Sequence, residues 1–290
     1  MNRDILAVIQ ENMNTFSKGQ KRIANYILES YDKAAFMTAS RLGKRVNVSE
    51  STVVRFAAEL GYDGYPSMQK SLQKMIRNRL TSVQRIEVAN DRIGDQNVLD
   101  MVLQSDIEKI RLTLEDIDRD SFDKATDAIV AARRIYIIGV RSSAAIATFL
   151  GFYFNLLFDN VAMITANTPS EVFESLLRVG EGDVVIGISF PRYSKRTVKA
   201  IDYAKEREAT VIAITDSAGS PLAAKCDHLL LARSDMASFV DSLVAPLSLI
   251  NALIVAVGMR RQKEVGETYA QLEKIWDEYD VYEKNEENIV

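Results

Sequence analysis

The hydrophobic and polar positions divide the chain into two parts with different periods. In roughly the first 130 residues, apolar side chains recur every three or four positions, the spacing of amphipathic helices. From Arg134 onward, short β-branched and apolar runs alternate with helical stretches. Apolar strands separated by helices indicate a parallel sheet covered on both sides. The sequence therefore predicts an all-α domain followed by an α/β domain with a doubly wound parallel sheet.

These periods give the individual elements. Helices are expected in the first part at residues 4–13, 18–30, 39–46, 50–60, 67–79, 97–116 and 121–132. Strands are expected at 135–140, 161–164, 184–189, 210–215 and 228–231, with helices at 143–158, 170–178, 194–206 and 221–225 between or after them. Two last helical regions are predicted, from Phe239 to Arg261 and from Val265 to Trp276. Polar residues and Pro246 in the apolar stretch before Met259 favour a buried helix over a membrane span.

A helix-turn-helix pattern lies between Thr38 and Gly61. Thr38 and Ser49 are typical helix-capping residues, Asn47 tolerates the left-handed backbone of a tight turn, and Gly61 ends the second helix. The apolar positions that face a shared core are Leu42, Val46, Val48, Val53, Phe56, Ala57 and Leu60. The pattern predicts two short helices joined by a tight turn.

The polar face of this pattern carries short polar groups and basic side chains near the start of the second helix. Such a face is typical of a recognition helix that contacts base edges and phosphates in the major groove. The sequence therefore predicts binding to double-stranded DNA. The predicted DNA-binding residues are Ser49, Glu50, Ser51, Thr52, Arg55, Lys44 and Arg45.

Charge is distributed unevenly along the 290 residues. Residues 1–80 carry thirteen Lys or Arg against seven Asp or Glu, a net charge of +6, whereas the whole chain carries −4. A basic front on an acidic body is the electrostatic pattern of a DNA-binding domain. Small helical domains are also often Lys-rich for solubility, so it is the helix-turn-helix pattern beside the charge that favours DNA. The single cysteine, Cys226, suits a reducing cytoplasm, and no signal pattern begins the chain.

A second site is predicted at the carboxyl ends of the strands, where ligands bind in open parallel sheets. Three loops there, residues 139–143, 189–197 and 215–217, are rich in hydroxyls and arginines. Hydroxyls and backbone N–H groups at helix N-termini suit a phosphate or a carboxylate, and arginine adds charge-assisted hydrogen bonds. The alternative is that these Ser and Thr residues only cap helices. The predicted ligand-binding residues are Arg141, Ser142, Ser143, Ser189, Arg192, Tyr193, Ser194, Thr197 and Thr215.

Seven short segments give the chain a resemblance to a known family. They are KRIANYI (21–27), FMTAS (36–40), VSESTVVRF (48–56), GYDGY (61–65), IYIIG (135–139), DVVIGIS (183–189) and ITDS (214–217). In this order and spacing, nearly all of residues 1–280 resemble the RpiR-type bacterial transcription regulators. The resemblance implies a helix-turn-helix domain joined to a flavodoxin- or Rossmann-like sugar isomerase (SIS) domain that binds phosphosugars. We expect a helix-turn-helix domain over 1–80, a linker and connecting helix over 81–120, the SIS domain over 121–265, and a C-terminal helix and tail over 266–290.

The phosphosugar motifs of that family are partly changed in this chain. Arg141 stands where a second glycine is common in Gly-x-Gly-x-Ser. In the segment that corresponds to Ser-x-Ser-Gly-x-Thr, Pro191 replaces a hydroxyl and Arg192 replaces a glycine, while Ser189 is kept and Ser194 stands for the threonine. Our hypothesis is that Arg141 and Arg192 clamp an anionic ligand. The alternative is that they turn away and pair with acidic residues, which leaves an altered pocket.

The residues favour a regulator over an enzyme. An SIS isomerase needs a base at the pocket, but His228 begins a strand at the opposite edge, and Glu171 and Glu174 are the carboxylates nearest to the loops. The loop at 139–143 lacks the glycines of a nicotinamide site, and an isolated Cys226-x-His228 pair does not make a metal site. No cofactor is therefore expected.

The expected function is that of a cytoplasmic regulator of carbohydrate metabolism genes. Its partners are a double-stranded DNA operator and a phosphosugar or acidic sugar effector, and no membrane. DNA half-sites call for a homodimer or higher homo-oligomer, with apolar helices near 144–158 and 239–257 as the dimerisation surface. The alternative function is a sugar-phosphate isomerase with an accessory helical domain.

Overall fold

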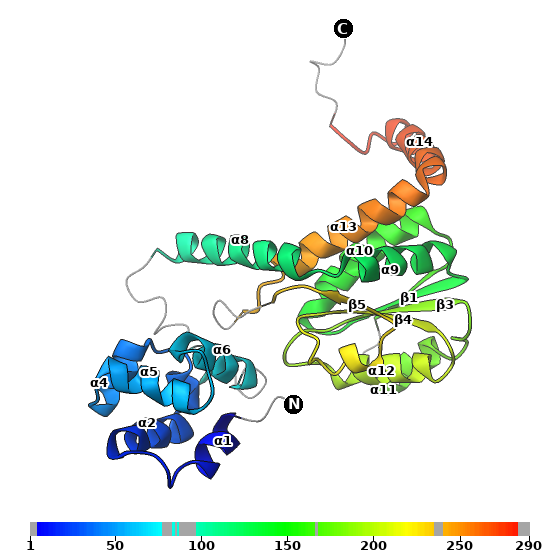
Figure 1. Ribbon diagram of the computed structural model, residues 1–290. Coiled ribbons are helices and arrows are strands. Elements are labelled where there is room, and N and C mark those ends of the chain that lie inside the picture. Colours follow the sequence, from blue (N-terminus) through cyan, green and yellow to red (C-terminus); the bar gives the residue numbers. More distant parts are fainter. Residues whose placement is uncertain are drawn as a thin grey trace. The chain divides into compact units, whose positions relative to one another are not determined.

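The computed structural model describes residues 5–76, 83–84, 86, 97–165, 168–234 and 240–283 of the chain. Two compact units are present, an N-terminal unit of Met1–Ser105 with Met236–Asp241 and a C-terminal unit of Asp106–Asp235 with Ser242–Val290. The boundary falls inside one helix, α8 (Val98–Asp116) (Figure 1). Each unit has its own hydrophobic core.

The N-terminal unit is built of short helices around one apolar core. Up to Ile76 they are α1 (Ile5–Glu11), α2 (Lys18–Glu29), α3 (Tyr31–Ala34), α4 (Ala39–Val46), α5 (Glu50–Glu59) and α6 (Tyr65–Ile76). Phe56 of α5 lies at the centre of this core, fully buried, with its ring 5.0 Å from that of Phe16. Ser17 caps α2 in a capping box, in which Ser17 and Gln20 bond each other's backbone N–H groups.

Two details of the N-terminal unit differ from expectation. The single turn α3 was not predicted, because four residues are too few to show a helical period. The helix expected from Ser67 begins two residues earlier, at Tyr65, and Pro66 occupies its second position. The end expected for this helix, after Ile76, lies outside the described residues.

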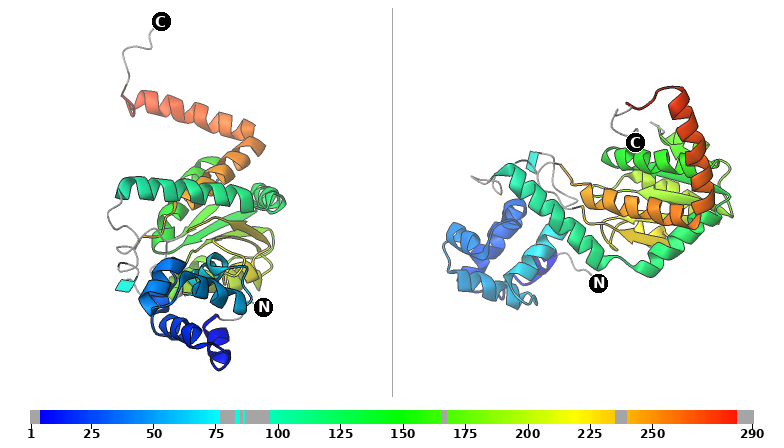
Figure 2. Two further views of the ribbon diagram at one scale, coloured as in Figure 1. Left: turned by 60° about the vertical axis from the view of Figure 1, so that its left-hand side comes forward. Right: turned by 90° about the horizontal axis from the view of Figure 1, so that it is seen from above.

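The C-terminal unit contains a sheet of five parallel strands in the order β2-β1-β3-β4-β5 (Figures 1 and 2). The strands are β1 (Arg134–Gly139), β2 (Val161–Ile164), β3 (Asp183–Ile188), β4 (Thr210–Thr215) and β5 (His228–Leu231). All five lie within one residue of their predicted bounds. This order confirms the doubly wound α/β fold and places a topological switch point between β1 and β3.

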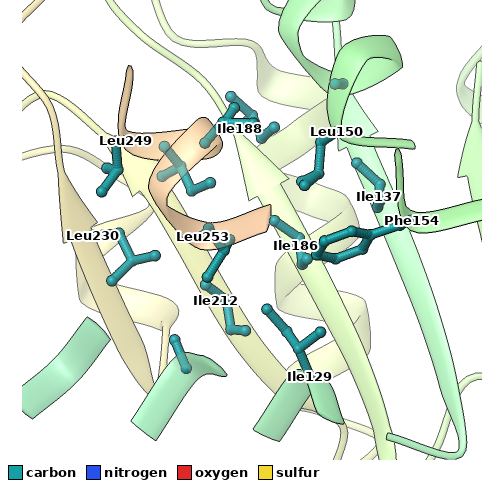
Figure 3. Close-up of a cluster of buried hydrophobic side chains, with 14 of the residues drawn as sticks. Ile129, Ile137, Leu150, Phe154, Ile186, Ile188, Ile212, Leu230, Leu249 and Leu253 are labelled. Carbon is teal, nitrogen blue, oxygen red and sulfur yellow. The ribbon is translucent and has the colours of Figure 1, made fainter. Parts of the chain in front are cut away.

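Helices cover both faces of this sheet, as the apolar strands require. On one face, α9 (Arg119–Ala131), α10 (Ser142–Leu157) and α13 (Val244–Arg260) enclose the core drawn in Figure 3. On the other face lie α11 (Pro169–Ser175) and α12 (Lys195–Lys205). Successive residues of each strand point alternately into two hydrophobic cores, one on each face of the sheet. Ile186 of β3 belongs to the first core and Val185 to the second.

Several helix bounds in the C-terminal unit correct the expectation. The helix expected over 221–225 is a single 3-10 turn, η1 (Ala223–Lys225), and α11 ends at Ser175 rather than Arg178. The start of α9 is Arg119, because the Asp118 side chain accepts the N–H groups of Asp120 and Ser121.

The last helix is longer than predicted, and the last two helices are separated by fewer residues than predicted. The described helix α13 begins at Val244 rather than Phe239, which lies outside the described residues, and only Arg261 separates it from α14 (Gln262–Glu278). The two helices are bent by 100° at this point, and no single helix in the described part of the chain is both long and apolar enough to cross a bilayer. The described α13 buries Leu249, Leu253 and four further residues in the core.

Candidate functional site

The turn between α4 and α5 has the geometry predicted for a helix-turn-helix. Asn47 adopts the left-handed conformation, with φ 54° and ψ 55°, and the Val48 N–H donates to the Gly43 carbonyl at 2.9 Å. A Cβ atom on Gly43 would lie only 2.8 Å from the Val48 carbonyl oxygen. A glycine is therefore required where the turn folds back on α4.

A side-chain cap sets the start of α5, and backbone hydrogen bonds after a glycine set its end. The Ser49 hydroxyl accepts the Thr52 N–H at 3.3 Å and lies 2.9 Å from the Ser51 hydroxyl. At the other end, Gly61 has φ 85° and its N–H bonds the Ala58 carbonyl, while the Tyr62 N–H bonds that of Ala57. The capping roles predicted for Thr38, Ser49 and Gly61 are confirmed.

The outer face of α4 and α5 holds all seven residues predicted to contact DNA. Six of them are exposed, and Thr52 is partly buried, with its hydroxyl 2.8 Å from that of Ser49. Arg55 Nε donates to the Ser51 carbonyl at 3.3 Å, which holds the guanidinium along the helix. Arg45 lies 5.9 Å from the ring of Tyr26. The exposed residues are Lys44, Arg45, Ser49, Glu50, Ser51 and Arg55.

Val54 shares this face of α5 and was missed by sequence reasoning. Its side chain is 42% exposed, next to Arg55. The signal in the sequence was weak, because a valine in an apolar run is usually assigned to the core. An exposed apolar side chain on such a helix is able to contact the methyl group of thymine.

In the C-terminal unit, three loops follow neighbouring strands at one edge of the sheet. The register pairs Gly139 with Ile188 and Ile188 with Ile214, so β1, β3 and β4 end side by side. The Ser189 N–H donates to the Ile214 carbonyl at 3.2 Å. The expectation that the hydroxyl-rich loops share an edge is therefore confirmed.

The loop after β3 is built around two serines. The Ser189 hydroxyl accepts the Ser194 N–H at 3.0 Å, and the Ser194 hydroxyl caps α12 by accepting the Thr197 N–H at 3.4 Å. Lys195 and Arg196 follow in the first turn of α12, so positive side chains add to the partial positive charge of this helix end. Both residues also line a pocket of about 100 Å³.

Asp216 is a second residue that the predicted site omitted. It is 5% exposed and follows β4 directly, and its carboxylate accepts the Tyr193 hydroxyl at 2.8 Å. The Thr215 hydroxyl lies 3.4 Å from the same carboxylate oxygen. Because Tyr193 belongs to the loop after β3, this contact ties the two loops together. The sequence signal that could have identified Asp216 is its position directly after a buried strand.

The two arginines of the hypothesised clamp are both exposed. Arg141 precedes α10 with φ 60° and ψ −125°, a backbone conformation that glycine adopts without strain. This explains why a second glycine is common at this position in related motifs. Non-glycine residues held in such conformations concentrate at binding sites.

Accessibility divides the nine predicted ligand residues. Arg141, Ser142 and Arg192 are exposed, and Tyr193 and Ser194 are half-buried. The remaining four are buried. Among the described residues, Thr197 Oγ1 has no hydrogen-bond partner. The buried residues are Ser143, Ser189, Thr197 and Thr215.

The groups considered for acid–base catalysis lie at the start of β5 and on α11. His228 begins β5, at the amino edge of the sheet and opposite the loops. The Glu171 carboxylate accepts the Thr168 N–H at 3.3 Å in the capping box of α11, and Glu174 is exposed on the same helix. Among the described residues, no three His, Cys, Asp or Glu side chains are grouped as metal ligands.

Comparison with known proteins agrees with both halves of this geometry. The helix-turn-helix domain of the rpiR family matches residues 3–79, and the SIS domain matches residues 128–256. The transcriptional regulator HexR of Escherichia coli is 28% identical over 263 residues, which cover 89% of each chain. An uncharacterised HTH-type transcriptional regulator of Caldanaerobacter subterraneus is 26% identical over 266 residues, 90% of this chain and 93% of that protein.

Two solved structures resemble this one. The sugar isomerase domain of an RpiR transcription factor from Sphaerobacter thermophilus is 29% identical, with a TM-score of 0.57 over 60% of this chain and 96% of that chain. The NanR protein of Vibrio vulnificus, complexed with ManNAc-6P, is 22% identical, with a TM-score of 0.59 over 95% of this chain and 99% of that chain, and shows the shared fold. The chain belongs to the rpiR family of helix-turn-helix transcriptional regulators, in which an SIS domain follows the helix-turn-helix domain.

Proposed function

We propose that this regulator recognises a DNA operator through α5. We further propose that an anionic sugar, either a phosphosugar or an acidic sugar, binds at the carboxyl edge of the sheet and controls DNA binding. The observation that carries the proposal is the presence on one chain of two exposed features. One is the polar face of α5, and the other is the hydroxyl-rich edge formed by the loops after β1, β3 and β4. The genes under control are those of carbohydrate metabolism.

For DNA, we infer that Ser51, Thr52 and Arg55 contact base edges while Lys44 and Arg45 contact phosphates. Base contacts supply the sequence preference, and phosphate contacts supply most of the affinity. Val54 adds an apolar contact to this face. Residues 1–80 form the reading head in this scheme, and the described part of that range holds α1 to α6.

For the effector, we infer that the first turn of α12 holds the phosphate or carboxylate. Ser189 and Ser194 offer hydroxyls there, and Lys195 offers charge. Arg141 and Arg192 complete the cationic clamp from neighbouring loops. The NanR protein, which shares this fold, was solved with a phosphosugar, and that agrees with an effector of this class. Residues 121–265 make up the sensing domain.

The active form is a homodimer, because one small reading head gives too little affinity and specificity. Large apolar side chains on α10 and α13 support this arrangement, since Phe152, Val255 and Met259 are 61%, 60% and 74% exposed. The protein works in the cytoplasm, where its DNA is. It is a sensor and not an isomerase, because the carboxylates near the loops serve as a helix cap or lie exposed on α11.

The test of this function combines three measurements on the full chain. DNA affinity is measured by fluorescence anisotropy on upstream fragments and on random duplex at moderate salt. We expect Arg55→Ala to weaken binding of the preferred fragment by about 1–3 kcal/mol, roughly 5- to 150-fold, while Arg111→Ala on the exposed face of α8 leaves that binding unchanged. Equal affinity for all fragments would refute the DNA assignment.

The effector is sought by thermal shift with 6-phosphogluconate, glucose 6-phosphate and N-acetylmannosamine 6-phosphate. A bound sugar raises the melting temperature by mass action. Arg192→Ala is expected to reduce this rise, and an unchanged response to every anionic sugar would refute the clamp. A coupled ketose–aldose assay tests the alternative function directly, and turnover there would make the protein an isomerase.

A further inference from the structure

We propose that a clasp between α8 and the segment after β5 transmits effector binding to the reading head. The clasp consists of Thr113 and Asp116 on α8 and Arg233 after β5. The inference rests on the proposed function and adds how the sensing site regulates DNA binding. All three residues belong to the C-terminal unit.

Arg233 contacts α8 through both its backbone and its side chain. The Arg233 N–H donates to the Thr113 hydroxyl at 2.9 Å, and that hydroxyl donates in turn to the Lys109 carbonyl at 2.8 Å. The Arg233 guanidinium forms an ion pair with Asp116, one turn further along α8. Thr113 is only 9% exposed. A backbone group and a side chain of one residue therefore hold two successive turns of the helix.

A buried network fastens the preceding turn of α8. Lys109, 3% exposed, lies 3.1 Å from the Asp106 carboxylate, and Asp106 accepts the Ser242 hydroxyl at 2.6 Å. The Ser234 hydroxyl donates to the Ser242 carbonyl at 3.1 Å. Residues 106–116 are thus bound to both ends of the segment between β5 and α13.

The same segment starts at the proposed effector site. Ala232 donates its N–H to the Thr215 carbonyl at 2.8 Å, and Arg233 is the next residue. On the other side of β4, the Ser189 N–H donates to the Ile214 carbonyl at 3.2 Å. Main-chain hydrogen bonds therefore lead from the loop after β3, across the end of β4, to the clasp. Close-packed elements of this kind transmit small displacements.

Helix α8 carries the signal onward because it is continuous across the boundary between the units. Residues 106–116 are held by the C-terminal unit, and Val98–Ser105 of the same helix belong to the N-terminal unit. A rotation of the clasped turns therefore moves the part of the helix that leads to the reading head. An effector acts in this way only if it binds one clasp geometry more tightly than another.

The test measures DNA affinity of the full chain with and without the sugar phosphate of the three above that gives the largest thermal shift. In the wild type, we expect the sugar to change DNA affinity by a factor of about 5–150. In Asp116→Asn and in Thr113→Val, this factor is expected to fall towards 1, while each variant still binds the sugar and still binds the operator. Hydrogen exchange over residues 106–116 should become faster in both variants.

Glu115→Gln is the matched control. It makes the same chemical change at the neighbouring residue, whose carboxylate pairs with Arg111 within α8 and not with the clasp. This variant should keep the wild-type factor. If Thr113→Val fails to fold, Asp116→Asn decides the question, because its side chain is 41% exposed.

The two levels of the proposal fail in different ways. If the wild type responds to the sugar and both clasp variants respond equally well, the clasp is wrong and the proposed function stands. If no sugar alters the melting temperature or the DNA affinity of the wild type, the regulatory function itself is wrong, and the clasp falls with it.

Discussion

Ser194 donates its backbone N–H to the hydroxyl of Ser189 at 3.0 Å, and this bond joins the end of β3 to the first turn of α12. A hydroxyl that accepts this bond keeps its own proton for another acceptor. The Ser189 proton is thereby available to a ligand oxygen at the helix N-terminus, where anions are favoured.

Ser189→Ala should therefore weaken binding of the sugar phosphate without affecting the reading head. A hydrogen bond to a charged group contributes about 1.5–3 kcal/mol, which corresponds to roughly 10- to 100-fold in the dissociation constant. Isothermal titration calorimetry measures the loss. Ser248→Ala on α13, which removes only a bond to the Val244 carbonyl, is the control and should bind as the wild type does. Equal binding by both variants would exclude Ser189 from the site.

Gly43→Ala should destabilise the N-terminal unit. The added Cβ would meet the Val48 carbonyl oxygen at 2.8 Å, and a backbone atom in a tight turn has little room to move. Overpacking of this kind costs about 1–3 kcal/mol. We expect a lower midpoint in urea, followed by circular dichroism, and weaker DNA binding because the angle between α4 and α5 changes.

Gly258→Ala in α13 is the comparison for that substitution. A Cβ there meets no atom within 4 Å, and alanine is favoured over glycine inside a helix by about 0.5–1 kcal/mol. This variant should be at least as stable as the wild type. A loss of stability in both variants would show that the close approach at Gly43 is not the cause.

Tyr65 makes the stability of the N-terminal unit depend on alkaline pH. Burial raises the pKa of Tyr65 to about 12, and its hydroxyl donates to the Met37 carbonyl at 2.7 Å. In the unfolded chain a tyrosine loses its proton near pH 10, so its contribution to stability is complete below pH 10 and is lost as the pH rises towards 12. The loss amounts to up to about 3 kcal/mol.

Tyr65→Phe isolates this effect. The variant should be less stable than the wild type by about 1 kcal/mol at pH 8, because the Met37 carbonyl loses a donor. The difference should shrink above pH 10 and then reverse, since only the wild type has a buried phenol to ionise. Urea titrations at pH 8, 10 and 11.5 measure it, and a constant difference would contradict the assignment.

Phe152→Glu should shift the proposed dimer towards monomer. Phe152 is 61% exposed on α10, so a charge there leaves the fold intact but opposes apolar contact with a second copy. Light scattering coupled to size-exclusion chromatography gives the mass. Leu177→Glu, at a residue 71% exposed that follows α11, is the control and should remain dimeric. A dimer that survives Phe152→Glu would place the interface elsewhere.

The sequence by itself determined the elements whose formation depends on neighbouring residues. The caps at Thr38 and Ser49, the left-handed Asn47 and the strand bounds were all predicted from residues within a few positions of one another. Capping and periodicity act over one or two helical turns or one strand, so they are legible in a single sequence.

Only the tertiary structure decided which distant residues meet. The bond between Tyr193 and Asp216 depends on β3 and β4 being neighbours, and the bond between Thr113 and Arg233 joins residues 120 positions apart. The bend of 100° between α13 and α14 was equally absent from the apolar pattern. Such contacts follow from how the packed sheet and helices close on one another, and local hydrophobic periodicity carries no record of that closure.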